Sequence, residues 1–141
     1  MTGPIPWSGG GYGRGVSTLT ELLCETPPFV PADAEMMVVT IDLTPGDPGA
    51  APHRHSGPVC GYVLEGAIVF ELEGEPERTI AAGEAFWEPG GDVIHYQAAN
   101  AFADAPSRFV VTMLCAPGQP MLTYVDDDEL AQRRDRRAPR P

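Results

Sequence analysis

Short apolar runs alternate with turn residues along most of the chain, and many of them are rich in β-branched or aromatic side chains. The clearest strand patterns span residues 36–43, 59–64, 67–73, 85–88 and 107–115, and weaker ones span 16–24, 78–81, 92–98 and 121–125. The 16 Gly and 16 Pro residues supply turns and disfavour long helices. Many short strands separated by such turns predict an all-β sandwich or barrel.

A domain organisation follows from the same pattern. Residues 1–15 are rich in Gly and predict a flexible N-terminal arm, whereas residues 16–125 form one barrel-sized domain. Residues 126–141 are a charged segment in which acidic residues open a short helix, and the Arg- and Pro-rich end is expected to be disordered. The Glu65-Gly66 pair predicts a tight hairpin turn, and the acids between Glu71 and Glu77 predict a solvated sheet edge.

Charge narrows the functional classes. The net charge is −11, so nucleic acid or an anionic membrane surface is a poor partner. All nine positive residues are Arg, and the absence of Lys excludes Schiff-base lysine chemistry. No apolar stretch is long enough for a transmembrane helix. Cys24, Cys60 and Cys115 are widely spaced and predict reduced, mostly buried thiols in a cytoplasmic protein.

The three histidines carry the strongest chemical signal. His53 and His55 are two positions apart, so both point to one face if they lie on a strand. His95 lies in another strand-like segment. Imidazole is the commonest metal ligand, so these three side chains predict one shared metal site.

Two motifs around these histidines resemble those of the cupin family. The first is His53-Arg54-His55 followed by Gly66, eleven residues after His55. The second is Gly83, five residues, Pro89-Gly90-Gly91, then His95 and Asn100, with each of the last two spacings one residue longer than usual. The resemblance covers about residues 36–115 and implies a jelly-roll barrel, the double-stranded β-helix, with a metal inside.

The family's acidic ligand of the first motif falls on Val59, which leaves a three-histidine site with an open position for water or substrate. Cys60 is expected to face away. Gln97, two residues after His95, is a candidate fourth ligand, and Glu88 is another. The expected cofactor is one divalent transition metal, with Zn and Fe favoured and Ni, Mn and Cu as alternatives.

An apolar pocket is expected above the metal, with a neutral apolar or aromatic small molecule as partner. The candidate lining residues are Val59, Tyr62, Phe70, Trp87, Tyr96, Phe109 and Met113. The resemblance, which includes cyclases of aromatic polyketides, favours a cyclase, isomerase or dehydratase that uses a Lewis-acid metal. A three-histidine Fe(II) dioxygenase and a non-catalytic small-molecule-binding protein are the alternatives. The general base is not identified, and a homodimer is expected because cupins commonly dimerise.

Overall fold

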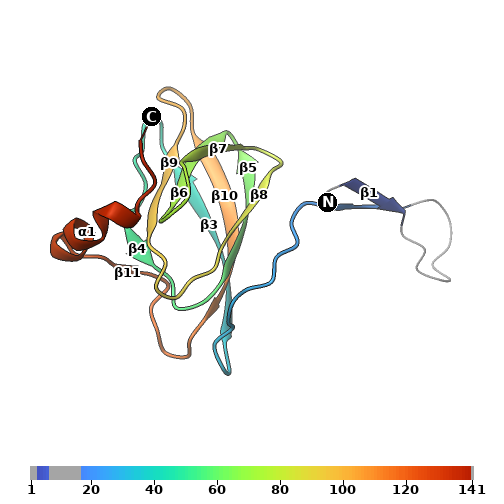
Figure 1. Ribbon diagram of the computed structural model, residues 1–141. Coiled ribbons are helices and arrows are strands. Elements are labelled where there is room, and N and C mark those ends of the chain that lie inside the picture. Colours follow the sequence, from blue (N-terminus) through green and yellow to red (C-terminus); the bar gives the residue numbers. More distant parts are fainter. Residues whose placement is uncertain (1–2, 7–16, 141) are drawn as a thin grey trace.

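The computed structural model describes residues 3–6 and 17–140. Within them, two antiparallel sheets face each other and enclose the core, which confirms the predicted all-β jelly-roll architecture (Figure 1). The first sheet has the strand order β3 (Glu35–Leu43), β10 (Ser107–Cys115), β5 (Val59–Glu65) and β8 (Ala85–Glu88). The second has the order β11 (Thr123–Tyr124), β4 (His53–Arg54), β9 (His95–Asn100), β6 (Ala67–Leu72) and β7 (Arg78–Ala81).

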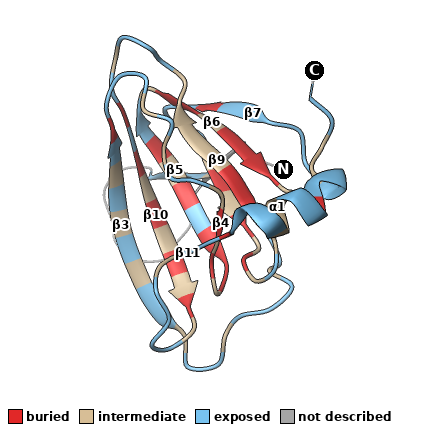
Figure 2. Cartoon of the chain, turned by 90° about the vertical axis from the view of Figure 1, so that its left-hand side faces the viewer, coloured by how far each residue is buried: buried red, intermediate tan, exposed pale blue. Residues whose placement is uncertain are grey.

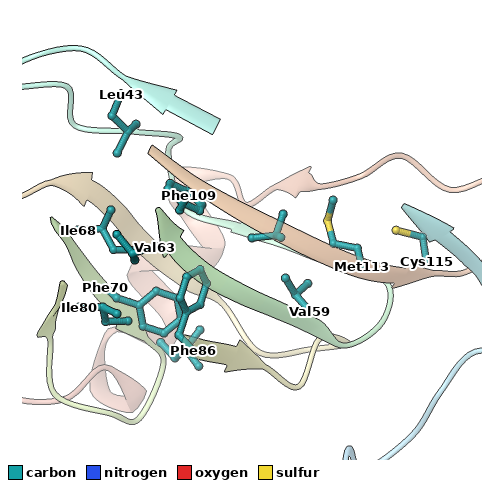
Figure 3. Close-up of a cluster of buried hydrophobic side chains, with 12 residues drawn as sticks. Leu43, Val59, Val63, Ile68, Phe70, Ile80, Phe86, Phe109, Met113 and Cys115 are labelled. Carbon is teal, nitrogen blue, oxygen red and sulfur yellow. The ribbon is translucent and has the colours of Figure 1, made fainter. Parts of the chain in front are cut away.

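Alternation along the strands sorts side chains into the core and the outer face. Every second residue of β10, from Ser107 to Cys115, is buried, and the banding of this strand is visible in Figure 2. The rings of Phe70 and Phe86 lie 4.8 Å apart between the two sheets, at one end of the cluster drawn in Figure 3. The periodicity of two therefore places one apolar face of each sheet inward, as the sequence pattern predicts.

One glycine is required by this packing. Gly61 faces inward on β5, and a Cβ atom there would lie 2.1 Å from Cζ of Phe86. The ring of Phe86 occupies the space that any larger residue at position 61 would need. An inward-facing glycine thus permits a large aromatic side chain on the neighbouring strand.

The prediction of a hairpin at Glu65-Gly66 is wrong. Strand β5 pairs with β8 and β10, whereas β6 pairs with β7 and β9, so the turn carries the chain from one sheet to the other. Gly66 has a φ of 74°, and a Cβ there would lie 2.1 Å from Oγ of Ser107. A short apolar–turn–apolar pattern is compatible with either connection.

The C-terminal segment is ordered, which corrects the expectation of a disordered tail. Helix α1 (Asp127–Arg133) is capped by the Asp126 carboxylate, which accepts a hydrogen bond from the Glu129 amide, and a 3₁₀ turn, Arg134–Arg136, follows. Figure 1 shows α1 beside β4 and β11. The helix therefore lies against the part of the barrel that contains β4.

The acidic run on and after β6 is only partly a solvated edge, because Glu75 and Glu77 are exposed whereas Glu71 is buried. Glu71 is 2% exposed, and both of its carboxylate oxygens accept hydrogen bonds from Arg137. Glu73 pairs with Arg133, and Arg140 also pairs with Glu71. Glu71 and Glu73 thus hold the arginine-rich segment against the barrel.

Strand β1 (Gly3–Pro6) pairs antiparallel with β2 (Thr18–Glu21), and β1 lies away from the barrel (Figure 1). Most of the arm predicted as flexible, residues 1–2 and 7–15, falls outside the described residues. All three cysteines are free, but only Cys115 is buried, so the prediction of mostly buried thiols is wrong for Cys24 and Cys60. Among the described residues, no helix has the length and apolar character that crossing a membrane requires.

Candidate metal centre

The three histidines lie together inside the barrel. His53 on β4 is directly paired with His95, the first residue of β9, and His55 follows β4 on the same side as His53. The His53 ring lies 4.9 Å from that of His55 and 4.8 Å from that of His95. One nitrogen from each ring falls within 4.8 Å of the other two, and all three side chains are buried. This is the three-histidine cluster that the spacing predicts.

Backbone carbonyls fix the orientation of the first two rings. Nδ1 of His53 lies 2.8 Å from the carbonyl oxygen of Ala51, and Nδ1 of His55 lies 2.7 Å from that of Met121. A carbonyl oxygen only accepts, so each Nδ1 carries the hydrogen and donates it. Each Nε2 then carries a free lone pair when the ring is neutral. Metal-binding histidines are typically oriented by such a partner on the other nitrogen.

His95 has the opposite arrangement of its two nitrogens. Its Nε2 donates to the carbonyl oxygen of Gln97 at 2.8 Å, so Nδ1 faces the cluster. This Nδ1 is fully buried and has no hydrogen-bond partner among the described residues. A buried acceptor without a donor is costly unless another species binds it.

A fourth side chain completes the cluster. Glu88, the last residue of β8, is 4% exposed, and its Oε1 lies 3.1 Å from Nδ1 of His95 and 3.6 Å from Nε2 of His55. No arginine among the described residues forms an ion pair with this carboxylate. Burial alone would raise the pKa of Glu88, but the neighbouring imidazoles, His95 foremost, hold that pKa below its ordinary value, because the positive charge that an imidazole carries when protonated favours the carboxylate.

Burial also keeps His53 neutral. Loss of solvation is the main cause that lowers the pKa of His53 to about 4, against the hydrogen bond to Ala51, which raises it. The nearby rings of His95 and His55 lower this pKa further. A neutral imidazole is the form that binds a metal. The orphaned Nδ1 of His95 and the two free Nε2 atoms therefore fit a divalent transition metal, and this group could hold one.

A cavity of about 310 Å³ opens beside the cluster. Its polar part consists of the three histidines and Glu88. The rest of its wall is mainly aliphatic and aromatic, and includes Ile41, Leu43, Ala50, Val59, Phe86, Ala98, Phe109, Val111, Met113, Met121, Leu122 and Tyr124. Val59, Phe109 and Met113 thus lie where the sequence places them. The strands supply most of this wall, and the segments around Ala50 and Met121–Tyr124 supply the rest.

Four predicted pocket residues do not line this cavity. Tyr62 and Trp87 alternate with inward-facing neighbours and border grooves on the outer face of the first sheet. Tyr96 packs with Ile94 and Val125 beneath the guanidinium of Arg137, which lies 4.2 Å from the ring centre. Phe70 belongs to the core beneath the site, where its ring lies 4.8 Å from that of His95.

Gln97 does not point into the cluster either. Its amide nitrogen donates to Glu71 at 2.9 Å and to Glu77 at 2.8 Å. The reason is a bulge: Leu72 pairs with His95 but Glu71 pairs with Gln97, so β9 has one extra residue between the two positions. A bulge breaks the two-residue alternation from which a shared face was inferred.

Sequence reasoning missed the residues of the cavity wall that belong to no motif. Ala50 precedes β4, and Met121, Leu122 and Tyr124 come from the C-terminal segment, which reaches the site because β11 pairs with β4. The weak strand pattern at 121–125 is the only signal that could have suggested this pairing. Nothing in the sequence indicates that the carbonyl of Met121 orients His55.

Comparison with known proteins assigns the fold to a family. The family model described as a cupin domain matches residues 39–113, which is more than half of the chain. The chain therefore belongs to the cupin family. No curated protein matches the sequence.

Solved structures share this fold. Oxalate oxidase in complex with the substrate analogue glycolate is 24% identical with a TM-score of 0.54, over 64% of this chain and 46% of that one. The DMSP lyase DddQ from Ruegeria pomeroyi is 20% identical with a TM-score of 0.54, over 64% of this chain and 43% of that one. An uncharacterised protein with a double-stranded β-helix domain from Klebsiella pneumoniae is 18% identical with a TM-score of 0.53, over 65% and 76%. The chain thus spans less than half of the oxidase and of the lyase, and at these identities the likeness concerns the fold.

Proposed function

We propose that this protein is a metal-dependent enzyme that acts on an uncharged, apolar small molecule. The observation that carries the proposal is the cluster itself. Three imidazoles, each held by a backbone carbonyl, turn their free nitrogens to one point at the polar end of an otherwise apolar cavity. The expected reaction is a cyclisation, isomerisation or dehydration of a polyketide-like or aromatic carbonyl compound.

The chain's own residues have three roles in this proposal. His53, His55 and His95 hold the metal, and their backbone partners keep the rings from rotating. A bound divalent metal would supply Lewis acidity that polarises a carbonyl oxygen. The aliphatic walls exclude water and position the carbon skeleton by shape, as in most small-molecule sites.

Charge favours a neutral substrate. Among the described residues, no arginine lines the cavity, and the chain contains no lysine, so a carboxylate substrate would find no cationic side chain in this wall. Oxalate and glycolate, named for one structural neighbour, are small carboxylates. We therefore do not extend that chemistry to this chain. The volume of about 310 Å³ lies at the lower end of ligand pockets, which favours one or two rings over a long chain.

The test begins with metal analysis of protein purified without added metal. One equivalent of a divalent metal is expected, and His55→Ala and His95→Ala should lose it while thermal melting shows that they remain folded. Zn would favour the cyclase-type reaction, whereas Fe(II) with oxygen consumption would favour the dioxygenase alternative, because the same three imidazoles suit either ion. Wild-type protein that neither contains metal nor binds added Zn²⁺, Fe²⁺ or Mn²⁺ would leave the binding-module alternative.

Turnover is tested separately with a panel of aromatic and 1,3-dicarbonyl compounds, followed by mass spectrometry. Conversion that the metal-free protein does not support is the expected result. Binding of a panel compound without conversion would again point to the non-catalytic alternative. A matched series that adds a carboxylate to the best substrate should bind less tightly, because the cavity wall offers no cation to pair with it.

A homodimer is part of the proposal, with a second copy of the chain on the outer face of the first sheet. Met36 is 71% exposed and Val38 61% exposed on the edge strand β3, and Leu64 is 46% exposed on β5. Exposed apolar side chains on one face of a sheet can contribute to an interaction site. The β1–β2 pair, with Leu19 53% exposed, lies where it can contact a neighbour. Light scattering should give twice 15.1 kDa, and Val38→Glu should give the monomer.

The cytoplasmic location stays a prediction.

A further inference from the structure

Glu88 is a buried acid without an ordinary partner. It stands directly opposite Val59 in the β5–β8 strand pair. Val59 occupies the position at which the cupin motif predicts an acidic ligand, and its side chain lines the cavity. A carboxylate on β8 therefore reaches the histidine cluster from the strand next to the one on which the motif predicts an acid.

The contacts of Glu88 require a proton or a metal cation between the acid and the rings. Its Oε1 lies 3.1 Å from Nδ1 of His95 and 3.6 Å from Nε2 of His55. Both nitrogens carry a free lone pair in the neutral tautomers. The hydrogen of each ring is on the opposite nitrogen, which donates it to the carbonyl oxygen of Gln97 or Met121. Oxygen and nitrogen lone pairs at such distances repel each other unless a positive species binds both.

Apart from the imidazoles themselves, the described residues place no cationic side chain beside Glu88. The buried carboxylate has no arginine partner among the described residues, and an unpaired buried charge is strongly unfavourable. A divalent ion would satisfy the free nitrogens and Oε1 at once. A protonated His95 would satisfy only its own contact with the acid and would leave the other free nitrogens without a partner.

We propose that Glu88 is the fourth protein ligand of the metal, transferred from β5 to β8 relative to the motif position at Val59. This inference rests on the proposed three-histidine metal site. Three imidazoles and one carboxylate suit ions that accept more than four ligands, such as Fe(II), Mn(II) and Ni(II), because these retain positions for water and substrate. Zn held by four protein ligands would be closed, as structural zinc sites are.

The test compares Glu88→Gln with the exchange variant Val59→Glu/Glu88→Val. Affinities for Zn²⁺ and Co²⁺ are measured by competition with a chromophoric chelator, and the absorption spectrum of the Co²⁺-loaded protein reports the ligand set. Glu88→Gln should weaken affinity by about 100-fold and change the spectrum, since loss of even an outer-shell partner costs 10–100-fold. The exchange variant should recover affinity to within about tenfold of the wild type. Glu84→Gln is the matched control, because Glu84 is an exposed acid just before the same strand, and it should change nothing.

The outcomes separate the two proposals. Wild-type affinity and spectrum in Glu88→Gln would overturn the role of Glu88 and leave the three-histidine site intact. That result would make Glu88 a buried acid that contacts the histidine cluster without binding the metal. A wild-type protein that binds neither ion would overturn the metal site and this inference together. If Glu88→Gln does not fold, the exchange variant decides: restored binding supports the carboxylate as a ligand, and a folded exchange variant without binding contradicts it.

Discussion

Replacing Arg133 with alanine should be among the most destabilising single changes in the C-terminal segment. The residue is 8% exposed, and all five of its N–H groups are used. Nε donates to Glu73 at 3.0 Å, one amino group donates to Asp92 at 2.9 Å and Glu129 at 3.1 Å, and the other donates to Glu73 and to the Asp92 carbonyl oxygen. These bonds join α1 to the end of β6 and to the loop before β9.

The loss of folding stability in Arg133→Ala depends mainly on the acidic partner that remains. Without the guanidinium, the Glu73 carboxylate, whose side chain is 9% exposed, would be left without its cation. Removing one member of a buried pair typically costs 3–5 kcal/mol, and we expect about 3 kcal/mol because this pair lies just beneath the surface. For a chain of this size, that loss lowers the melting temperature by about 10 °C.

The assay is urea unfolding followed by tryptophan fluorescence, with Arg136→Ala as the matched control. Arg136 belongs to the next turn, is 64% exposed and approaches Asp92 only to 4.0 Å, so its removal should be nearly neutral. Arg133→Lys keeps the charge but cannot reproduce the two-pronged contact with Glu73, and should lie between the two. Equal midpoints for Arg133→Ala and Arg136→Ala would refute the reasoning, because the network would then contribute nothing that an exposed pair does not.

Two further predictions concern the site and its packing. The metal-free protein should lose about 2 kcal/mol of stability between pH 7 and pH 5, because the pKa of His53 is about 4 when folded and near 6.5 when unfolded, so the unfolded state binds more protons in this window. His53→Asn should flatten the dependence of the urea midpoint on pH, and an unchanged slope would contradict this assignment. Gly61→Ala should cost about 2 kcal/mol by overpacking against Phe86. Gly61→Ala/Phe86→Leu should recover part of that loss, and a double variant no more stable than Gly61→Ala would show that the ring is not the obstacle.

The fold and the histidine cluster could be predicted because they depend on local periodicity. Alternation every second residue is a property of any strand packed on one face, and it holds along β10. The same rule failed at Gln97 because a bulge inserts one residue after His95. A bulge depends on how two strands pair, and a single strand's pattern does not show it.

The ion pairs of the C-terminal segment could not be predicted for a different reason. Arg133 and Glu73 are 60 positions apart, and Arg137 and Glu71 are 66 apart. The sequence contains 20 acids for nine arginines, so charge alone does not select partners. Burial makes the selection, and burial is decided by where α1 packs on the barrel.

The C-terminal segment nevertheless contributes to the geometry of the candidate metal centre. Strand β11 pairs with β4, which carries His53, and the carbonyl oxygen of Met121 accepts the hydrogen bond that orients His55. Arg54, between the two histidines, is held by Glu129 of α1. Two of the three histidines of the candidate metal centre thus take their position from residues outside the cupin motifs. The cupin motifs supply the imidazole nitrogens. The direction in which these nitrogens point depends in part on the C-terminal segment, which Arg133 anchors to the barrel. Loss of that anchor should therefore weaken metal binding as well as folding.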